Sequence, residues 1–191
     1  MCSKKMIDDK IFYIIAGANG SGKTTFALNY TALNELDFIN ADEIAKSYDP
    51  YDISKYKVKA GKEFFKQLEI NLNNNRSFMI ESTLSGKYLK NVIYKAKEKG
   101  FNVLLIYLFL ETETENISRV KNRVLNGGHN VPKEDIKRRY YRSRKLFWNI
   151  YKDIVDKWIL FFNGDDDYEM VANQDEIFID YLYENFVKEI K

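Results

Sequence analysis

The octapeptide at positions 17–24 limits the possible folds of this chain more than any other part of its sequence. Its residues, GANGSGKT, fit the pattern G-x-x-x-x-G-K-[ST] and lie between an apolar run at residues 11–16 and a stretch of helical composition at 24–30. Glycines allow the backbone to turn its N–H groups inward, and the N-terminus of a following helix adds positive partial charge. The octapeptide therefore predicts a strand, a phosphate-binding loop and a helix, in that order.

The lysine and the threonine of this loop have separate expected roles. We expect Lys23 to reach the β and γ phosphates of a bound nucleotide, and Thr24 to place its hydroxyl on Mg²⁺. The chain has no Asn-Lys-x-Asp segment of the guanine-reading kind, so we predict ATP as the nucleotide. The predicted nucleotide-binding residues are Gly17, Ala18, Asn19, Gly20, Ser21, Gly22, Lys23, Thr24 and Thr25.

Segments typical of strands alternate with segments typical of helices along the rest of the chain. Short β-branched or apolar runs predict strands, and apolar residues at three- and four-residue spacing predict helices. One long helix is expected at 53–74, where the residues with this spacing are Val58, Phe64, Phe65, Leu68 and Leu72. The predicted strands are 11–16, 37–40, 77–81, 101–110 and 158–162, with an edge strand at 169–172. The other predicted helices are 24–30, 88–99, 113–125, 133–154 and 175–190.

This alternation predicts an α/β fold with a mainly parallel five-stranded sheet and helices on both faces. With the phosphate loop, it predicts the three-layer fold of kinase-like P-loop NTPases. The Gly-Gly loop at 126–130 separates two predicted helices and could act as the hinge of a helical lid. With 191 residues and 45% hydrophobic content, we expect a single domain over residues 1–191.

Charge and cysteine content restrict the expected partners and compartment. The 30 basic and 28 acidic residues nearly cancel, so we expect neither a nucleic-acid nor a membrane-surface partner. The single cysteine, Cys2, cannot form an intramolecular disulfide, which favours a reducing compartment. No window approaches the roughly 20 apolar residues of a membrane span. We therefore expect a soluble, cytoplasmic protein.

Polar residues follow the second and third predicted strands, at the edge where a parallel sheet binds its ligand. A kinase needs a carboxylate that orients the attacking hydroxyl and accepts its proton, and Asp42 is the candidate general base. The alternative is that Asp42 caps a helix that begins near Glu43. Glu81 is expected to order a Mg²⁺-bound water or to bind the acceptor, and Ser82 and Thr83 offer it hydroxyls. A solvated acid at the sheet edge is the alternative for Glu81.

Positive charge for the transferred phosphoryl group is available on two predicted helices. The candidates are Arg119 and Arg123, which share one helical face, and Arg138, Arg139 and Arg142 beyond the Gly-Gly loop. For each arginine, a solvated basic helix face is the alternative. We expect His129, in the Gly-Gly loop, to be structural, since it has no obvious nucleophile to activate.

Six segments, in order over most of the chain, match a known sequence pattern. They are AGANGSGKTTFA at 16–27, FINADEIA at 38–45, SFMIESTLSG at 77–86, NISRVKNR at 116–123, GGHNVP at 127–132 and IKRRY at 136–140. The series resembles the zeta toxin-like P-loop kinases. This resemblance implies phosphate transfer from ATP to a hydroxyl of a nucleotide sugar, typically UDP-N-acetylglucosamine, often under the control of a small antitoxin.

The resemblance also implies roles for matching residues. Lys23 and Thr24 match the positions that serve the phosphates and the metal, and Asp42 matches the general base. Glu81 and Thr83 match contacts to the substrate or the metal.

Two further positions concern the arginines and the end of the last core strand. Arg123 and Arg138 match the phosphate-stabilising pair, although Arg119 and Arg139 are immediate alternatives in register. Many relatives carry an Asp-Asn-Ser segment after the last core strand, whereas this chain has Phe162-Asn163-Gly164. Any role of that Asp is therefore absent from this chain.

Three other functions compete with a sugar-nucleotide kinase. A nucleoside or polynucleotide 5′-kinase would use the same aspartate, but the near-zero net charge disfavours a nucleic-acid acceptor. A P-loop ATPase that acts as a switch would use hydrolysis to drive a partner. A binding module that has lost transfer is disfavoured, because the lysine, the aspartate and the arginines are all present.

Overall fold

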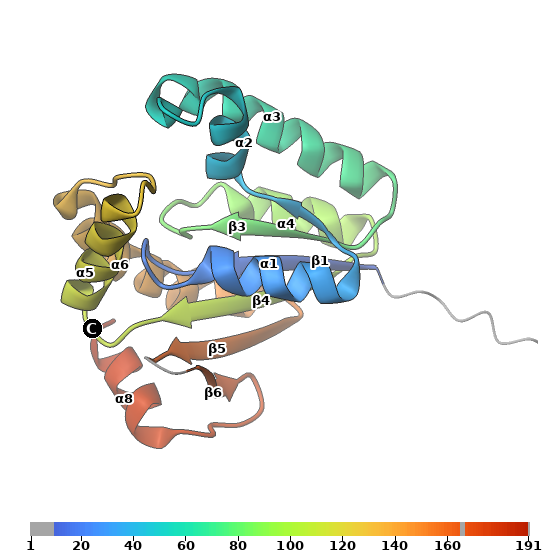
Figure 1. Cartoon of the computed structure of the whole chain (residues 1–191). Coiled ribbons are helices and arrows are strands. Elements are labelled where there is room, and N and C mark those ends of the chain that lie inside the picture. Colours follow the sequence, from blue (N-terminus) through green and yellow to red (C-terminus); the bar gives the residue numbers. More distant parts are fainter. Residues whose placement is uncertain (1–9, 165–166, 191) are drawn as a thin grey trace, which may run out of the picture.

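One six-stranded sheet, in the order β2-β3-β1-β4-β5-β6, forms the centre of the molecule (Figure 1). The computed structural model describes residues 10–164 and 167–190, and Cys2 lies outside these residues. The strands are β1 Ile11–Ala16, β2 Asp37–Ile39, β3 Phe78–Ser82, β4 Asn102–Phe109, β5 Lys157–Asn163 and β6 Tyr168–Asn173.

Five of these strands run parallel, and β6 joins β5 as an antiparallel edge strand. The central strand is β1, whose last residue Ala16 pairs with Ser82 of β3 and Tyr107 of β4. Because parallel strands end at the same edge of a sheet, the loop after β1 lies beside the ends of β3 and β4. The predicted mainly parallel sheet is confirmed, including the edge strand expected at 169–172.

Helices cover both faces of the sheet, as predicted. They are α1 Lys23–Asn34, α2 Ala41–Tyr48, α3 Ile53–Asn73, α4 Leu89–Glu98, α5 Glu113–Leu125, α6 Lys133–Leu146, the π-helical turn η1 Phe147–Tyr151, α7 Lys152–Ile154 and α8 Asp180–Lys188. Figure 1 shows α5 and α6 beyond the edge at which the parallel strands end. Within residues 10–164 and 167–190, none of the helices combines the length and the apolar character that a membrane span requires.

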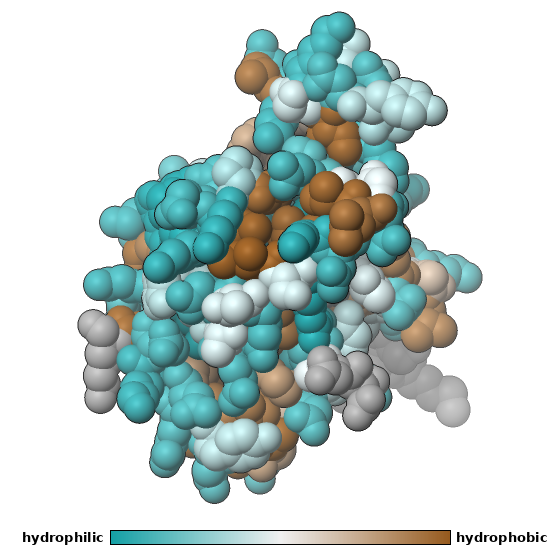
Figure 2. All heavy atoms as spheres, turned by 60° about the vertical axis from the view of Figure 1, so that its left-hand side comes forward, coloured by the Kyte–Doolittle hydropathy of each residue, from teal (hydrophilic) through white to brown (hydrophobic). Residues whose placement is uncertain are grey.

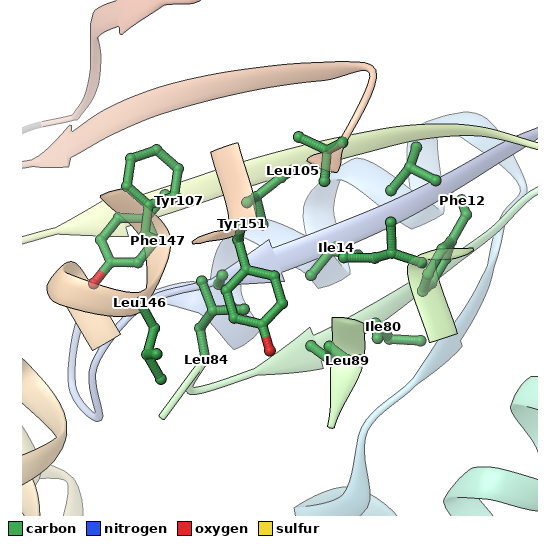
Figure 3. Close-up of a cluster of buried hydrophobic side chains, with 14 of the residues drawn as sticks. Phe12, Ile14, Ile80, Leu84, Leu89, Leu105, Tyr107, Leu146, Phe147 and Tyr151 are labelled. Carbon is green, nitrogen blue, oxygen red and sulfur yellow. The ribbon is translucent and has the colours of Figure 1, made fainter. Parts of the chain in front are cut away.

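The larger hydrophobic core lies on the face covered by α3, α4, α6, η1 and α8. Phe12 and Ile14 of β1 both face this core and are fully buried. Figure 3 shows them near Ile80 of β3 and Leu105 of β4, with Tyr151 of η1 above the sheet. Burying one such side chain contributes about 1.5–3 kcal/mol, so this face supplies much of the stability that holds the strand ends in place.

On the opposite face, α1 provides most of the cover. Ala27 of α1 is fully buried against Ile15 of β1, and Leu108 of β4 belongs to the same cluster. The ring of Phe26, also from α1, packs against Phe161 of β5 at 5.5 Å between centroids. The helix that begins at the phosphate loop is thereby fixed on the sheet by its own apolar side chains.

The long helix at 53–74 forms as predicted, but two of the apolar residues whose spacing predicted it do not face the core. Val58 is 76% exposed and Phe65 is 47% exposed. The buried row instead consists of Ala60, Phe64, Leu68 and Leu72. The members of this row are four residues apart and share one side of the helix. Val58 lies two positions before Ala60 and Phe65 one position after Phe64, so both point to other sides of the helix.

The segments at 133–154 and 175–190 differ in detail from their predicted helices. The first forms a continuous helical run, but its middle, η1, is a π-helical turn that buries Phe147 and Tyr151. The second becomes helical only at Asp180. Residues 175–179 are irregular because the Asn173 side chain accepts bonds from two backbone N–H groups there and Phe178 N donates to Val171 O of β6.

Candidate active site

The predicted phosphate loop lies between β1 and α1 and has the expected backbone form. Gly17 and Gly22 have φ values of 143° and 87°, a region that L side chains rarely adopt. A Cβ on Gly17 would lie 2.1 Å from the carbonyl oxygen of Leu108 in β4. Both positions therefore require glycine, and the loop packs directly against the sheet.

Lys23 is buried at the floor of the site, with only 4% of its surface exposed. Its ammonium group donates to Ala18 O at 2.8 Å and lies 3.7 Å from Glu81 Oε1. Burial lowers the pKa of the ammonium below its ordinary value, and the nearby carboxylates of Glu81 and Asp42 oppose this shift. The lysine is thus a desolvated cation whose charge depends on these acids.

Glu81 receives two hydrogen bonds at the end of β3. Thr24 Oγ1 donates to Glu81 Oε2 at 2.8 Å, and Asn40 Nδ2 donates to the same oxygen at 2.7 Å. The structure therefore brings the predicted Thr24 and Glu81 together. It does not support the alternative of a solvated acid, because this carboxylate has bonded partners from two other segments.

Asp42 lies in the first turn of α2, where it is exposed at the edge of the cleft. The cap of this helix is Asn40, whose Oδ1 accepts from Asp42 N at 2.8 Å and from Glu43 N at 3.2 Å. The alternative that the Asp42 side chain serves as the cap is therefore wrong, and its carboxylate is not used in capping.

One cleft of about 410 Å³ unites these residues with α5 and the Gly-Gly loop that follows it. Figure 2 views the molecule from the side of α5 and α6, where the part that holds α2 and the start of α3 projects above the body. The lining residues are Asn19, Gly20, Gly22, Lys23, Thr24, Thr25, Asn40, Asp42, Glu43, Lys46, Pro50, Ile53, Glu81, Thr83, Arg119, Arg123, Gly127, Gly128 and His129. The residues predicted to bind the nucleotide and those predicted to bind the phosphate acceptor therefore line the same cleft.

Two hydroxyl residues were predicted to follow the strand expected at 77–81; Thr83 lines this cleft, whereas Ser82 is the last residue of β3 and does not. Ser82 is buried, and its Oγ accepts from Leu84 N at 3.0 Å and lies 3.3 Å from the Tyr88 hydroxyl. As a strand residue, it points to the opposite side from its neighbour Glu81. The predicted substrate contact of Ser82 is therefore replaced by a bond that shapes the turn after β3.

The arginines divide between the cleft and the surface. Arg123 lines the cleft, and its Nη2 donates to His129 O at 2.8 Å, which holds the Gly-Gly loop against α5. Arg119 also lines the cleft and donates to Asn163 O and Gly164 O at 3.0 and 2.9 Å.

The two neighbouring arginines of α6 point in different directions. Arg138 has a side chain that is 53% exposed and bonds to Asp135 at 2.8 Å. Arg139 Nη1 instead donates to Asn19 Oδ1 of the phosphate loop at 3.0 Å. The structure brings Arg139 to the phosphate loop and leaves Arg138 at the surface, so of these two alternatives in register it is Arg139 that contacts the loop.

His129, expected to be structural, lines both the main cleft and an adjoining hollow of about 180 Å³. Burial lowers the pKa of its imidazole; the Asp42 carboxylate opposes this shift, while Lys57, Arg123 and Arg139 reinforce it. The neutral form of the ring is therefore favoured, and the ring borders the part of the cleft that Asp42 also lines.

Asn40 is a site residue that the sequence analysis missed. The signal was present, since an Asn followed three residues later by a Glu is typical of a helix start. Its bond to Glu81, 41 residues away, had no such signal because it depends on the pairing of β2 with β3.

The fold and this cleft define a class of protein: a P-loop NTPase of the kinase type, in which helices α5 and α6 each donate a hydrogen bond to the phosphate loop. The family model described as Zeta toxin matches residues 3–174. The chain belongs to the zeta toxin family, and it is a kinase-type enzyme.

Comparisons with individual proteins show one similar sequence and two similar structures. An uncharacterized protein of Haemophilus influenzae is 34% identical over 136 residues, which are 71% of this chain and 94% of that protein. A structure of the PezAT chromosomal toxin-antitoxin system of Streptococcus pneumoniae has a TM-score of 0.70 at 19% identity, covering 97% of this chain and 81% of that chain. A structure of AvrRxo1-ORF1:-ORF2 with ATP has a TM-score of 0.73 at 17% identity, and the match covers 93% of this chain and 63% of that chain. The TM-scores show that both structures share the fold of this chain, and at identities of 19% and 17% the likeness extends to the fold alone.

Proposed function

We propose that this enzyme transfers the γ-phosphate of ATP to a hydroxyl group of a small molecule, and that the acceptor is a nucleotide sugar such as UDP-N-acetylglucosamine. The observation that carries the proposal is that Asp42 and the phosphate loop border the same cleft. A carboxylate at that point can orient the acceptor hydroxyl toward the γ-phosphate and take its proton.

The other cleft residues supply charge and orientation in this proposal. Lys23 and Arg123 stabilise the negative charge of the transferred group, because they carry donors into a partly desolvated cleft. Thr83 offers a hydroxyl to the acceptor. Arg139 takes the position at the loop that was first assigned to Arg138, since it reaches Asn19.

The donor set at Thr24 and Glu81 fits Mg²⁺. The Thr24 hydroxyl and a Glu81 carboxylate oxygen lie 2.8 Å apart, and hard oxygen atoms are the ligands that this ion prefers. We assign Thr24 as the direct ligand and Glu81 as the residue that orders a metal-bound water. When bound, Mg²⁺ neutralises charge on the phosphate oxygens.

We further propose a small antitoxin protein as a partner and the cytoplasm as the place of action. The partner is supported by the PezAT toxin-antitoxin system, whose structure shares this fold. The compartment is supported by the expected use of ATP.

The test is a transfer assay with γ-labelled ATP and Mg²⁺ against UDP-sugars, nucleosides and 5′-hydroxyl oligonucleotides. Asp42→Asn keeps the side-chain shape but removes the base, so it should still bind ATP while transfer falls by about a hundredfold or more. Asp153→Asn, at an aspartate of α7 whose side chain is 62% exposed, is the matched control and should transfer at the wild-type rate.

Each arm of the assay has a distinct meaning. Label on a UDP-sugar supports the proposed acceptor, whereas label only on nucleosides or oligonucleotides replaces it with a 5′-kinase function. If no acceptor is labelled and ATP hydrolysis is equal in wild type and Asp42→Asn, phosphotransfer as proposed here is refuted.

A further inference from the structure

Two side chains from the β5–β6 hairpin hold the phosphate loop by hydrogen bonds to its backbone. Asn163 Nδ2, at the end of β5, donates to Ser21 O at 3.0 Å. The Tyr168 hydroxyl, at the start of β6, donates to Gly22 O at 3.1 Å. They therefore bind two consecutive carbonyl groups of the loop, and we call this pair the P-loop clamp.

Each member of the P-loop clamp is fixed by its own surroundings. Asn163 is 9% exposed, and its backbone oxygen accepts a bond from Arg119 of α5 at 3.0 Å. The ring of Tyr168 packs edge-on against Phe26 of α1, with centroids 5.1 Å apart. The clamp therefore contacts the loop from positions set by the sheet, α5 and α1.

The fit between the clamp and the loop is close. A Cβ on Gly22 would lie 2.1 Å from Asn163 Nδ2 and 3.2 Å from the Tyr168 hydroxyl. Glycine at this position lets the backbone reach both donors. It also leaves the loop with a residue of wide conformational freedom, which the two bonds restrict.

We propose that Asn163 and Tyr168 are positioning residues that set the direction of the phosphate-binding N–H groups. In a trans peptide unit, the C=O and the following N–H point in opposite directions. Gly22 O also accepts from Phe26 N of α1 at 3.1 Å, so Tyr168 adds a second bond to this carbonyl. Together, the bonds to Ser21 O and Gly22 O direct the N–H groups of Gly22 and Lys23 away from the hairpin, toward the cleft that both residues line. This proposal rests on the proposed function in one respect: the ligand of these N–H groups is taken to be the phosphate chain of ATP.

This role explains the residue type found at the end of the last parallel strand. The side-chain amide of Asn163 can donate to a carbonyl, whereas an ionised carboxylate can only accept. An Asp at this position would direct an oxygen at Ser21 O, so Asn163→Asp should be more damaging to ATP binding than Asn163→Ala. The segment Phe162-Asn163-Gly164 thus has a use of its own at the nucleotide site.

The experiment measures the Kd of ATP by titration calorimetry, with thermal unfolding of the nucleotide-free protein in parallel. Tyr168→Phe keeps the ring against Phe26 and removes only the donor, so the Kd should rise roughly two- to tenfold. The same variant should raise the KM for ATP and leave the KM for the acceptor unchanged. Tyr181→Phe, at a tyrosine of α8 that is 60% exposed, is the matched control and should change neither constant.

The outcomes separate this role from a purely structural one. A higher Kd for ATP with an unchanged unfolding temperature supports positioning, and Tyr168→Phe gives this answer even where an Asn163 variant fails to fold. An unchanged Kd in Tyr168→Phe, with or without a loss of stability, overturns the proposal while leaving the proposed function intact. If the wild-type protein binds no ATP, both are overturned.

Discussion

Replacing Glu81 by Gln removes one negative charge from the floor of the active site while keeping the size of the side chain. Its Oε2 accepts bonds from Thr24 and Asn40, and its Oε1 faces Lys23 at 3.7 Å. In Glu81→Gln the amide oxygen can still accept the two bonds. The NH₂ group of the glutamine then takes the place of Oε1 and faces the ammonium of Lys23, to which it offers no hydrogen-bond acceptor.

The main expected effect concerns the charge of Lys23. Two unit charges 3.7 Å apart interact by about 1–4 kcal/mol between the dielectric limits of water and a protein surface. Burial already lowers the pKa of Lys23, and the Glu81 carboxylate opposes that shift. Without the carboxylate the pKa falls further, so the ammonium loses its proton at a lower pH than in the wild-type protein.

The assay is the Kd of ATP measured from neutral pH to about pH 10. Affinity should decline as the pH rises and Lys23 loses its charge, and this decline should begin at lower pH in Glu81→Gln. The affinity at pH 7 is not the test, because removing a carboxylate also removes its repulsion of the phosphates. Glu69→Gln, which removes the acid of a half-exposed pair with Lys95, is the control. A decline at the same or a higher pH in Glu81→Gln would refute the reasoning.

Four further substitutions, in three experiments, test other parts of the site. Asn40→Ala removes the cap of α2 and should lower the free energy of unfolding by about 1–2 kcal/mol in urea titrations; an unchanged value would contradict the capping role. Arg139→Ala should reduce phosphate transfer about tenfold or more, whereas Arg138→Ala should reduce it less than about twofold. A larger effect of Arg138→Ala than of Arg139→Ala would return the phosphate-stabilising role to Arg138. Gly22→Ala places a Cβ against Asn163 and should weaken ATP binding about tenfold or more in the same calorimetric titration, so wild-type affinity would count against the close fit.

The fold was predictable because its signals are local. The octapeptide at 17–24 requires a strand before it and a helix after it, and both are found as β1 and α1. The apolar run at 101–110 forms β4, whose residues Leu105 and Leu108 are fully buried on opposite sides. Each of these features depends on residues that are close in the sequence.

The details of the site were less predictable because they depend on register in three dimensions. Adjacent helix positions such as Arg138 and Arg139 differ by about 100° in direction, so a sequence pattern cannot decide which one faces the loop. Ser82 and Glu81 alternate across a strand in the same way. The bonds of Asn163 and Tyr168 to the loop connect segments more than 140 residues apart. No local sequence pattern in either segment predicts a contact with the other.

The bonds at both ends of the Asn40 side chain have a thermodynamic consequence for the binding of the two substrates. One end of this side chain holds the first turn of the helix that carries Asp42, and the other holds the carboxylate beside Thr24. A ligand that shifts this carboxylate therefore also shifts the capping free energy of α2. Such a coupling is reciprocal, so whatever binding ATP does to the affinity for the acceptor, the acceptor does equally to the affinity for ATP. A single amide therefore connects the metal and phosphate side of the cleft to the helix that carries the proposed base.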